Sequence, residues 1–454
     1  MIVVRAGFKE GGFEARQAHT IASAGPPANV PHALFTLWTS LRGEPQTMEP
    51  MTRPPAVSQS RRLALVTLDW LPAWMLSTWG ATWLATPTFD RLAARGVALD
   101  AVMAAGDDMQ ATLQAVVGPA CGLLEQQQIP SSLLVTDATA VSRSADFSCF
   151  QDVFEEPASA AEQCQEDEED TALGQLFLEA EDAVAAMTED ACWLWCHAGS
   201  LGTVWDAPLD FRDCLVDEDD PLPPRSAAVP SRVVGPGDDP DLVLGVRQAF
   251  AGQVMLADRM LGRLLEAIDQ EASQGRPWTV IVAGLRGMPL GLHQQVGVPE
   301  LGQPVLLPYA DLVQMPVLVA DAAGRMEGQR YGGLLAAEDV GELCRDLLEG
   351  KQQSRLSGLL ERWECEPRPR LVSETQRGLA VLTSEWRVVV DQAGRGGQVE
   401  STAEDLSPRS PQVFAKPDDF FEQVDVADRC PGVAEEVLAA SRGASAADDA
   451  PDGC

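Results

Sequence analysis

Aspartates that directly follow apolar runs are the residues of this chain best placed to do chemistry. Asp69 ends the apolar run 63–68, and Asp107 and Asp108 come shortly after the run 97–102. Carboxylate oxygens are the ligands that hard divalent cations prefer. The sequence therefore leaves open a cation site built from Asp69, Asp107 and Asp108.

Two other groupings of polar residues have simpler explanations. Cys192, Cys196 and His197 belong to Cys-Trp-Leu-Trp-Cys-His, which separates the cysteines by three residues where haem attachment normally uses two. Its apolar neighbours favour core packing in a buried strand. The acidic stretches 163–170 and 217–240 could bind a cation, but solvated insertions are the commoner explanation of such stretches. The chain has no Gly-x-Ser-x-Gly, no His-Glu-x-x-His and no phosphate-binding glycine-rich loop.

Apolar runs alternate with amphipathic stretches from residue 61 onward, and this alternation predicts the elements that position these residues. Strands are predicted over 63–68, 97–102, 133–136, 192–197, 278–283 and 316–320. Helices are predicted between Thr86 and Gly96 and over 171–187, 241–269 and 338–348. Continuously apolar strands separated by helices imply a mostly parallel sheet covered on both faces, which is an α/β fold.

The pattern changes toward the C-terminus. A hairpin over 378–383 and 386–390, a strand at 413–415 and a helix over 433–440 predict a small α+β subdomain. The expected organisation is a disordered extension over 1–60, which carries seven prolines, an α/β domain over 61–350, the subdomain over 351–440 and a flexible tail over 441–454.

Composition excludes several classes of protein. The 454 residues are 45% hydrophobic without a run of eighteen apolar residues, so a membrane-spanning chain is excluded. The 33 basic and 68 acidic residues leave a net charge of −35, which makes nucleic acid and anionic membrane surfaces poor partners. The ten cysteines show no framework spacing, and no signal-peptide pattern opens the chain. We therefore expect a cytoplasmic protein with reduced thiols.

Several segments together resemble the sulfatases of the alkaline phosphatase superfamily, in particular degenerate bacterial sulfatase-like proteins. The segment 65–69, Leu-Val-Thr-Leu-Asp, is similar to the strand that carries the family's first metal ligands, and 85–97 is similar to the helix after it. The segment 284–293, Gly-Leu-Arg-Gly-Met-Pro-Leu-Gly-Leu-His, stands where the family has its second metal motif. The resemblance covers about 61–440. It implies a mostly parallel sheet sandwiched by helices, with a small C-terminal α+β subdomain.

The resemblance also implies a chemistry whose residues are largely missing here. The family holds a divalent cation, usually calcium, with two strand-end aspartates and an aspartate–histidine or aspartate–asparagine pair. It attacks sulfur with a formylglycine made from the Cys or Ser of Cys/Ser-x-Pro/Ala-x-Arg. Only the first aspartate remains, as Asp69. The replaced positions are Trp70, Leu285 and Arg286 at the metal, and Gly106, Asp108 and Gln110 in the nucleophile motif. Tryptophan and leucine provide no ligand, and arginine repels a cation.

The predicted protein is accordingly a pseudoenzyme with no catalytic residue and no cofactor, acting as a binding or scaffolding protein for a small anionic ligand or a protein partner. The alternative is an active metal-dependent sulfuric or phosphoric ester hydrolase with a rearranged site, whose cofactor would be calcium. His197 and His293 are candidate ligand-binding residues because they could match family positions around sulfate, although an isolated histidine is more often structural. Arg286 is expected to project toward the former metal position and pair with Asp69 in place of the cation.

Overall fold

The computed structural model describes residues 61–136, 141, 149–156, 162–235, 237–299, 306–392 and 410–444, without the side chains of 125, 156 and 442–444. The chain divides into two units, Met1–Val57 and Ser58–Cys454, and every described residue belongs to the second. The predicted extension over 1–60 and residues 445–454 of the predicted tail lie outside the described residues. None of the described helices is long and apolar enough to cross a membrane.

A nine-stranded sheet forms the centre of the described part of the chain. Its strands are β1 (Arg61–Leu68), β2 (Val97–Met103), β3 (Ser131–Thr136), β4 (Asp152–Glu156), β5 (Ala191–Ala198), β7 (Thr279–Gly284), β9 (Gln314–Ala320), β10 (Gln329–Tyr331) and β11 (Leu335–Ala336). The order is β10-β2-β9-β7-β1-β5-β3-β4, with β11 also paired to β2. Strand β9 runs antiparallel to β7 and β2, and the other pairs among these strands are parallel.

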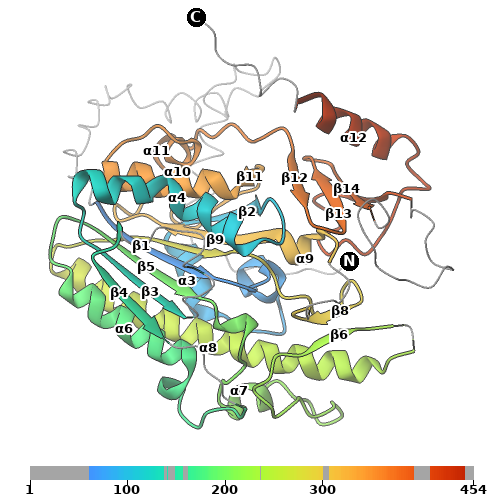
Figure 1. Cartoon of the computed structure of the whole chain (residues 1–454), viewed down its shortest axis with the longest axis horizontal. Coiled ribbons are helices and arrows are strands. Elements are labelled where there is room, and N and C mark those ends of the chain that lie inside the picture. Colours follow the sequence, from blue (N-terminus) through green and yellow to red (C-terminus); the bar gives the residue numbers. More distant parts are fainter. Residues whose placement is uncertain are drawn as a thin grey trace, which may run out of the picture. The chain divides into compact units, whose positions relative to one another are not determined.

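Helices cover both faces of this sheet (Figure 1). The α-helices of this part of the chain are α3 (Pro87–Arg95), α4 (Met109–Gln127), α6 (Ala172–Ala186), α7 (Leu209–Asp213), α8 (Pro240–Ser273), α9 (Ala310–Val313), α10 (Ala337–Glu349) and α11 (Arg355–Arg362). Helices α4 and α10 pack together on one face, and α6 packs with α8 on the other. Strands enclosed in this way must be apolar on both sides. Accordingly β1, β3, β5, β7 and β9 are buried along nearly their whole length.

A second, antiparallel sheet follows the main one. It contains β12 (Leu371–Glu374), β13 (Gly378–Leu382), β14 (Trp386–Asp391) and β15 (Gln412–Ala415), and α12 (Val433–Ala444) packs against it. A short ribbon of β6 (Ser231–Val233) and β8 (Gln295–Gly297) completes the described strands. The predicted hairpin is present as β13 and β14, and the predicted α/β class with a C-terminal α+β subdomain is confirmed.

Some boundaries differ from those the sequence predicts. Leu356, Leu359 and Leu360 of α11 belong to the core of the main sheet, so α11 packs with the main sheet although it lies beyond the predicted boundary at 350. Helix α12 extends four residues past the predicted end at 440. Helix α4, which no sequence pattern predicted, lies between β2 and β3 and contains Gly118 and Pro119.

Candidate functional site

Neighbouring strand ends bring Asp69 and Arg286 together. Strands β1 and β7 are parallel and aligned so that Leu68 lies opposite Gly284. The pairing continues one step further, because the Leu285 amide donates to the Leu68 carbonyl at 2.9 Å. The residues after each strand therefore emerge at the same carboxyl edge of the sheet, where ligands commonly bind in α/β folds.

Arg286 forms a two-pronged ion pair with Asp69. Its Nε donates to Asp69 Oδ1 at 2.9 Å and its Nη2 to Asp69 Oδ2 at 2.9 Å. Its Nη1 donates to the main-chain carbonyl of Asp107 at 2.8 Å. The side chains of Arg286 and Asp69 are 19% and 5% exposed, so the pair is largely removed from water. The predicted pairing of Arg286 with Asp69 is confirmed.

Trp70 forms a platform under this guanidinium. The Arg286 Cζ lies 3.9 Å from the centroid of the indole ring, within the range of a cation–π contact. Trp70 adopts a left-handed backbone conformation, with φ of 64°, and is buried. A Cβ on Gly202 would lie 2.2 Å from the indole Cδ1, so the main chain at Gly202 packs directly on the ring. Trp70, which the sequence predicts to provide no ligand, thus packs against Arg286.

The other two aspartates do not complete a cation site with Asp69. Asp108 caps α4, accepting hydrogen bonds from the amides of Gln110 at 2.9 Å and Ala111 at 3.4 Å. Burial raises the pKa of Asp107, whose carbonyl is already bound by Arg286. Asp69, Asp107 and Asp108 are all described, and no group of three or more His, Cys, Asp or Glu in the described residues could hold a metal ion. The alternative cation site is therefore not formed.

The C-terminal sheet closes over Gly106, the residue expected at the nucleophile position. Gly106 forms a bridge with Glu374 at the end of β12, and the Glu374 amide donates to the Ala105 carbonyl at 2.7 Å. Ser373 Oγ donates to the Ala104 carbonyl at 2.7 Å. A Cβ at position 106 would lie 2.1 Å from the Glu374 carbonyl oxygen. A cysteine or serine cannot stand at 106 unless β12 moves.

Solved structures with the same architecture extend over most of this chain. A protein in complex with its substrate D-glucosamine-2-N,6-O-disulfate has a TM-score of 0.63 and 11% identity, covering 87% of this chain and 99% of its own. The phosphonate monoester hydrolase of Agrobacterium radiobacter has a TM-score of 0.61 and 12% identity, covering 85% and 95%. A 2-O GAG sulfatase has a TM-score of 0.58 and 13% identity, covering 85% and 91%. This chain has the sulfatase fold. No protein-family model and no curated protein matches it.

The sulfatase fold was expected from the sequence, and at these identities the likeness shows the fold alone. The calcium that the resemblance implies does not fit the residues present in this chain. Both oxygens of Asp69 accept hydrogen bonds from Arg286, Trp70 lies against the guanidinium, and Leu285 is buried in the core. Gln110 lies in the first turn of α4.

His197 is buried on β5, and its role in ligand binding stays a prediction. It is 1% exposed on β5, and its Nδ1 lies 2.9 Å from Thr67 Oγ1. Trp195 Nε1 donates to the same hydroxyl at 2.9 Å. Cys192 and Cys196 are buried on the same strand, and burial raises the pKa of both thiols. The structure therefore favours core packing for this segment, as the sequence predicts.

The contacts of His293 are with Tyr309 and Asp311 and do not include Asp69. Its ring stacks on Tyr309, with centroids 3.6 Å apart and planes within 7°. Its Nε2 lies 4.0 Å from Asp311 Oδ1 and has no hydrogen-bond partner among the described residues. The role of His293 in ligand binding stays a prediction.

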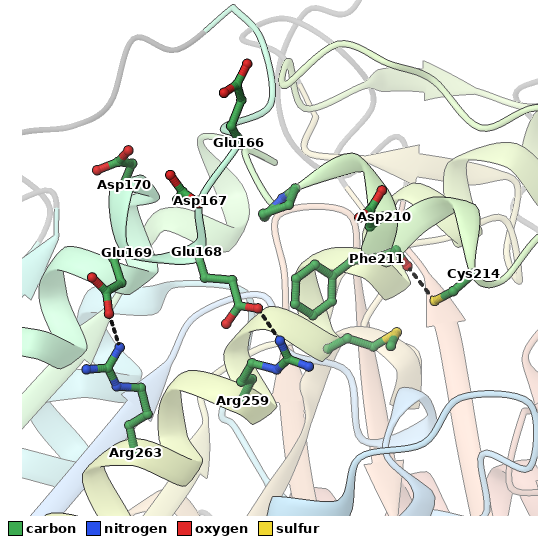
Figure 2. A pocket seen from close by; sticks show the side chains of 12 residues that line it. Glu166, Asp167, Glu168, Glu169, Asp170, Asp210, Phe211, Cys214, Arg259 and Arg263 are labelled. Atoms are coloured by element: carbon green, nitrogen blue, oxygen red, sulfur yellow. Dashed lines mark hydrogen bonds and ion pairs between the residues drawn. The ribbon is translucent and has the colours of Figure 1, made fainter.

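The acidic stretch at 163–170 contributes to a pocket of about 670 Å³ beside α7 and α8 (Figure 2). Ion pairs join Arg259 to Glu168 and, at 2.7 Å, Arg263 to Glu169. The guanidinium of Arg259 also lies 5.2 Å from the ring centroid of Phe211. These arginines anchor the loop to α8, and none of the predicted site residues lines the pocket.

Proposed function

We propose that this sulfatase-fold chain does not hydrolyse sulfate or phosphate esters and acts instead by binding a small anionic ligand or a protein partner. The observation that carries the proposal is the pairing of Arg286 with Asp69. An internal cation already neutralises the one remaining carboxylate of the family's metal site.

A guanidinium can replace the charge of a metal ion but not its chemistry. A catalytic metal polarises a substrate oxygen or acidifies a bound water through an open coordination position. Arg286 instead directs Nε and Nη2 to Asp69 and Nη1 to the Asp107 carbonyl. Its hydrogen-bonding capacity is thus mostly used inside the protein, which supports a structural rather than a catalytic role.

The surroundings of Gly106 support the same proposal. Hydrolysis in this family begins at a side-chain nucleophile, and glycine offers none. The Glu374 carbonyl takes the space that such a side chain would need. The metal and nucleophile positions are therefore both unsuited to ester hydrolysis.

A comparison of calcium with a chelator tests the proposal. We expect the Tm of the full chain to be the same in excess calcium and in EDTA, because a ligand raises Tm only when it binds the folded state. We also expect no turnover of 4-nitrophenyl sulfate, 4-nitrophenyl phosphate or phenylphosphonate esters, with a calcium-dependent sulfatase as the positive control. A calcium-dependent rise in Tm would show that the metal site is intact and reopen the hydrolase alternative, and turnover that EDTA abolishes would establish it.

A disulfated sugar is the first compound that we would test as a small anionic ligand. A protein of the same fold takes D-glucosamine-2-N,6-O-disulfate as its substrate. We propose calorimetric titration of the full chain with this sugar, with unsulfated glucosamine as the control. The net charge of −35 disfavours nucleic acid and anionic membranes as partners, and a cytoplasmic location remains part of the proposal.

A further inference from the structure

A cavity of about 120 Å³ lies where residues 289–295 and 306–312 meet Arg377 of the C-terminal subdomain. An engineered apolar cavity of about 150 Å³ takes up a benzene molecule, so this cavity has room for a small organic group. Neither Asp69 nor Arg286 lines it. The cavity is therefore distinct from the ion pair at the former metal position.

The wall of this cavity combines apolar side chains with sheltered polar groups. The polar groups include His293 and Asp311, whose side chains are 14% and 7% exposed. The apolar part of the wall comes from Pro289, Leu306, Leu307 and Leu312. Such a wall suits a ligand that has one polar group on a small apolar body.

Asp311 lies in the cavity without a close cationic partner. Its ion-pair contact in the described part of the chain is with His293, whose Nε2 lies 4.0 Å from Asp311 Oδ1, longer than a hydrogen bond. Burial, followed by repulsion from Glu422, raises the pKa of Asp311 to about 7. The ionised carboxylate is thus poorly compensated by the protein itself.

The cations nearest to this carboxylate pair with other acids. Arg387 Nε and Lys416 Nζ each lie 3.0 Å from Glu422 Oε1. Arg377, which also lines the cavity, lies 3.0 Å from Asp391 Oδ2 through its Nη2. A cation that neutralises the cavity carboxylate at close range therefore has to come from outside the described part of the chain.

His293 offers a second acceptor to such a cation. Its Nε2 is buried and has no hydrogen-bond partner among the described residues. Burial lowers the pKa of His293 to about 4, so the ring is neutral near pH 7 and can accept a hydrogen bond at Nε2. Because this nitrogen lies 4.0 Å from Asp311 Oδ1, one donor atom can lie about 2.9 Å from both.

The two acceptors select among polar groups. An ammonium group has three N–H donors and a positive charge, so it can donate to the carboxylate and to the imidazole at once. A hydroxyl group has a single donor and no charge. A carboxylate or sulfate group is repelled by Asp311. An ammonium group therefore matches the two acceptors best.

The cavity opens to solvent beside β6. Val233 of β6 is 50% exposed, Gln294 is exposed, and both line the cavity. Gln294 has a left-handed backbone conformation, with φ of 65°, and its carbonyl accepts from the Val234 amide at 2.7 Å. Strained backbone of this kind is often found where a protein holds a ligand. A small molecule can thus enter beside Gln294.

We propose that this cavity binds a small primary amine, whose ammonium group donates to Asp311 and His293 and whose apolar part packs against Pro289 and the leucines of the wall. The site adds a second ligand to the proposed function and does not depend on it, because the Asp69–Arg286 pair lies outside the cavity.

Thermal unfolding of the full chain with butylamine, 1-butanol and butyrate tests the cavity. At pH about 8.5 Asp311 is ionised and butylamine still carries its proton. We expect butylamine to raise Tm with an affinity about tenfold or more above that of 1-butanol, because charged hydrogen bonds are the stronger ones, and butyrate to have no effect. All samples have the same ionic strength, since a net charge of −35 attracts any cation.

Three outcomes with the natural chain overturn the proposal. The absence of any rise in Tm would mean that the cavity holds water only. Equal effects of butylamine and 1-butanol would mean that it binds apolar groups without selecting charge. A rise with butyrate alone would mean that Arg377 makes it an anion site.

A matched pair of variants isolates the carboxylate. Asp311→Asn keeps the size of the side chain and removes its charge, so the rise in Tm with butylamine should fall to that with 1-butanol. Glu364→Gln removes an exposed carboxylate outside the cavity and changes the net charge by the same amount. It should keep the full response. Equal responses of D311N and E364Q overturn the proposal.

NMR signals of the histidine rings locate the bound amine. The chain has four histidines, and the signal that is missing from H293F belongs to His293. We expect butylamine to shift this signal in the natural chain and to leave it unchanged in D311N. A rise in Tm with butylamine that leaves the His293 signal unchanged would place the amine elsewhere and overturn the proposal.

Discussion

Arg286 shows how one guanidinium can support a buried carboxylate at the edge of a sheet. Asp69 is 95% buried by side-chain area, and a carboxylate in that setting requires a partner. Arg286 satisfies both of its oxygens and is itself supported by Trp70 and the Asp107 carbonyl. Trp70 and Arg286 therefore act together on Asp69.

Removal of this guanidinium should be costly. Arg286→Ala leaves Asp69 buried without its counter-charge, and we expect the free energy of unfolding to fall by about 3 kcal/mol. The control is Arg95→Ala, which breaks an ion pair with Asp269 whose side chains are 40% and 46% exposed. That variant should lose less than about 1 kcal/mol. Denaturant unfolding measures both, and equal losses would contradict a special role for Arg286.

Asp311 provides a second test at the residue scale. Its pKa of about 7 in the folded state exceeds the ordinary value of 3.8, so the folded state binds more protons between these values. Its contribution favours the folded state at low pH and is lost as the pH rises through 7. Asp311→Asn should therefore stabilise the protein by about 2 kcal/mol or more at pH about 8.5 and by much less at pH about 4. Thermal unfolding at the two pH values checks this, and an equal effect at both would refute it.

At the scale of elements, the contact between β12 and the segment before α4 determines what position 106 can hold. The amide and carbonyl of Glu374 lie against Ala105 and Gly106, so the site is bounded by main chain rather than by movable side chains. This boundary belongs to the C-terminal sheet and lies about 270 residues further along the chain. The residues around position 106 therefore carry no pattern from which this contact with Glu374 could be predicted.

A methyl group is enough to test this boundary. Gly106→Ala places its Cβ 2.1 Å from the Glu374 oxygen, and we expect a loss of about 2 kcal/mol as β12 is displaced. Gly122→Ala in α4 is the control, because no atom lies within 4 Å of its added Cβ. Alanine is favoured over glycine inside a helix, so G122A should be neutral or stabilising by about 0.5 kcal/mol. Loss of stability in G122A but not in G106A would contradict the packing described.

At the scale of the whole described unit, two sheets meet through buried charge. Glu422, Arg387 and Lys416 have side-chain exposures of 0%, 1% and 12%. Such a cluster contributes less to net stability than to fixing how its parts fit, because desolvation offsets most of the attraction. Its arrangement specifies one docking of the C-terminal sheet, through the Ala310 amide and the Pro308 carbonyl.

Neutralising the central carboxylate should weaken that docking. Glu422→Gln leaves Arg387 and Lys416 buried with less compensation, and we expect a loss of about 3 kcal/mol. Glu364→Gln, which alters an exposed pair with Arg362, should change stability by less than about 0.5 kcal/mol. Denaturant unfolding measures both variants. Similar effects of the two would show that the buried cluster does not hold the sheets together.

Strands and helices with a regular pattern of apolar residues could be predicted from the sequence, because each packs against the core in the same way along its whole length. Strand β5 is apolar except for His197. Helix α8 is capped by Asp239 and begins at Pro240. Helix α4 was missed because buried residues occur around much of its circumference and glycine and proline interrupt it. The antiparallel direction of β9 could not be predicted either, because a fully buried strand has the same apolar pattern whether it runs parallel or antiparallel to its neighbours.

The sequence by itself determined the α/β class, the resemblance to sulfatases and the pairing of Arg286 with Asp69. These predictions depend on residue types and on two strand ends being neighbours. The fold implied by the resemblance places those strand ends next to each other. Only the tertiary structure decided that Trp70 supports the guanidinium, that Glu374 closes over Gly106 and that His293 stacks on Tyr309. Each of these contacts joins segments far apart in the chain, so its existence depends on how the sheets and loops pack and not on any local pattern.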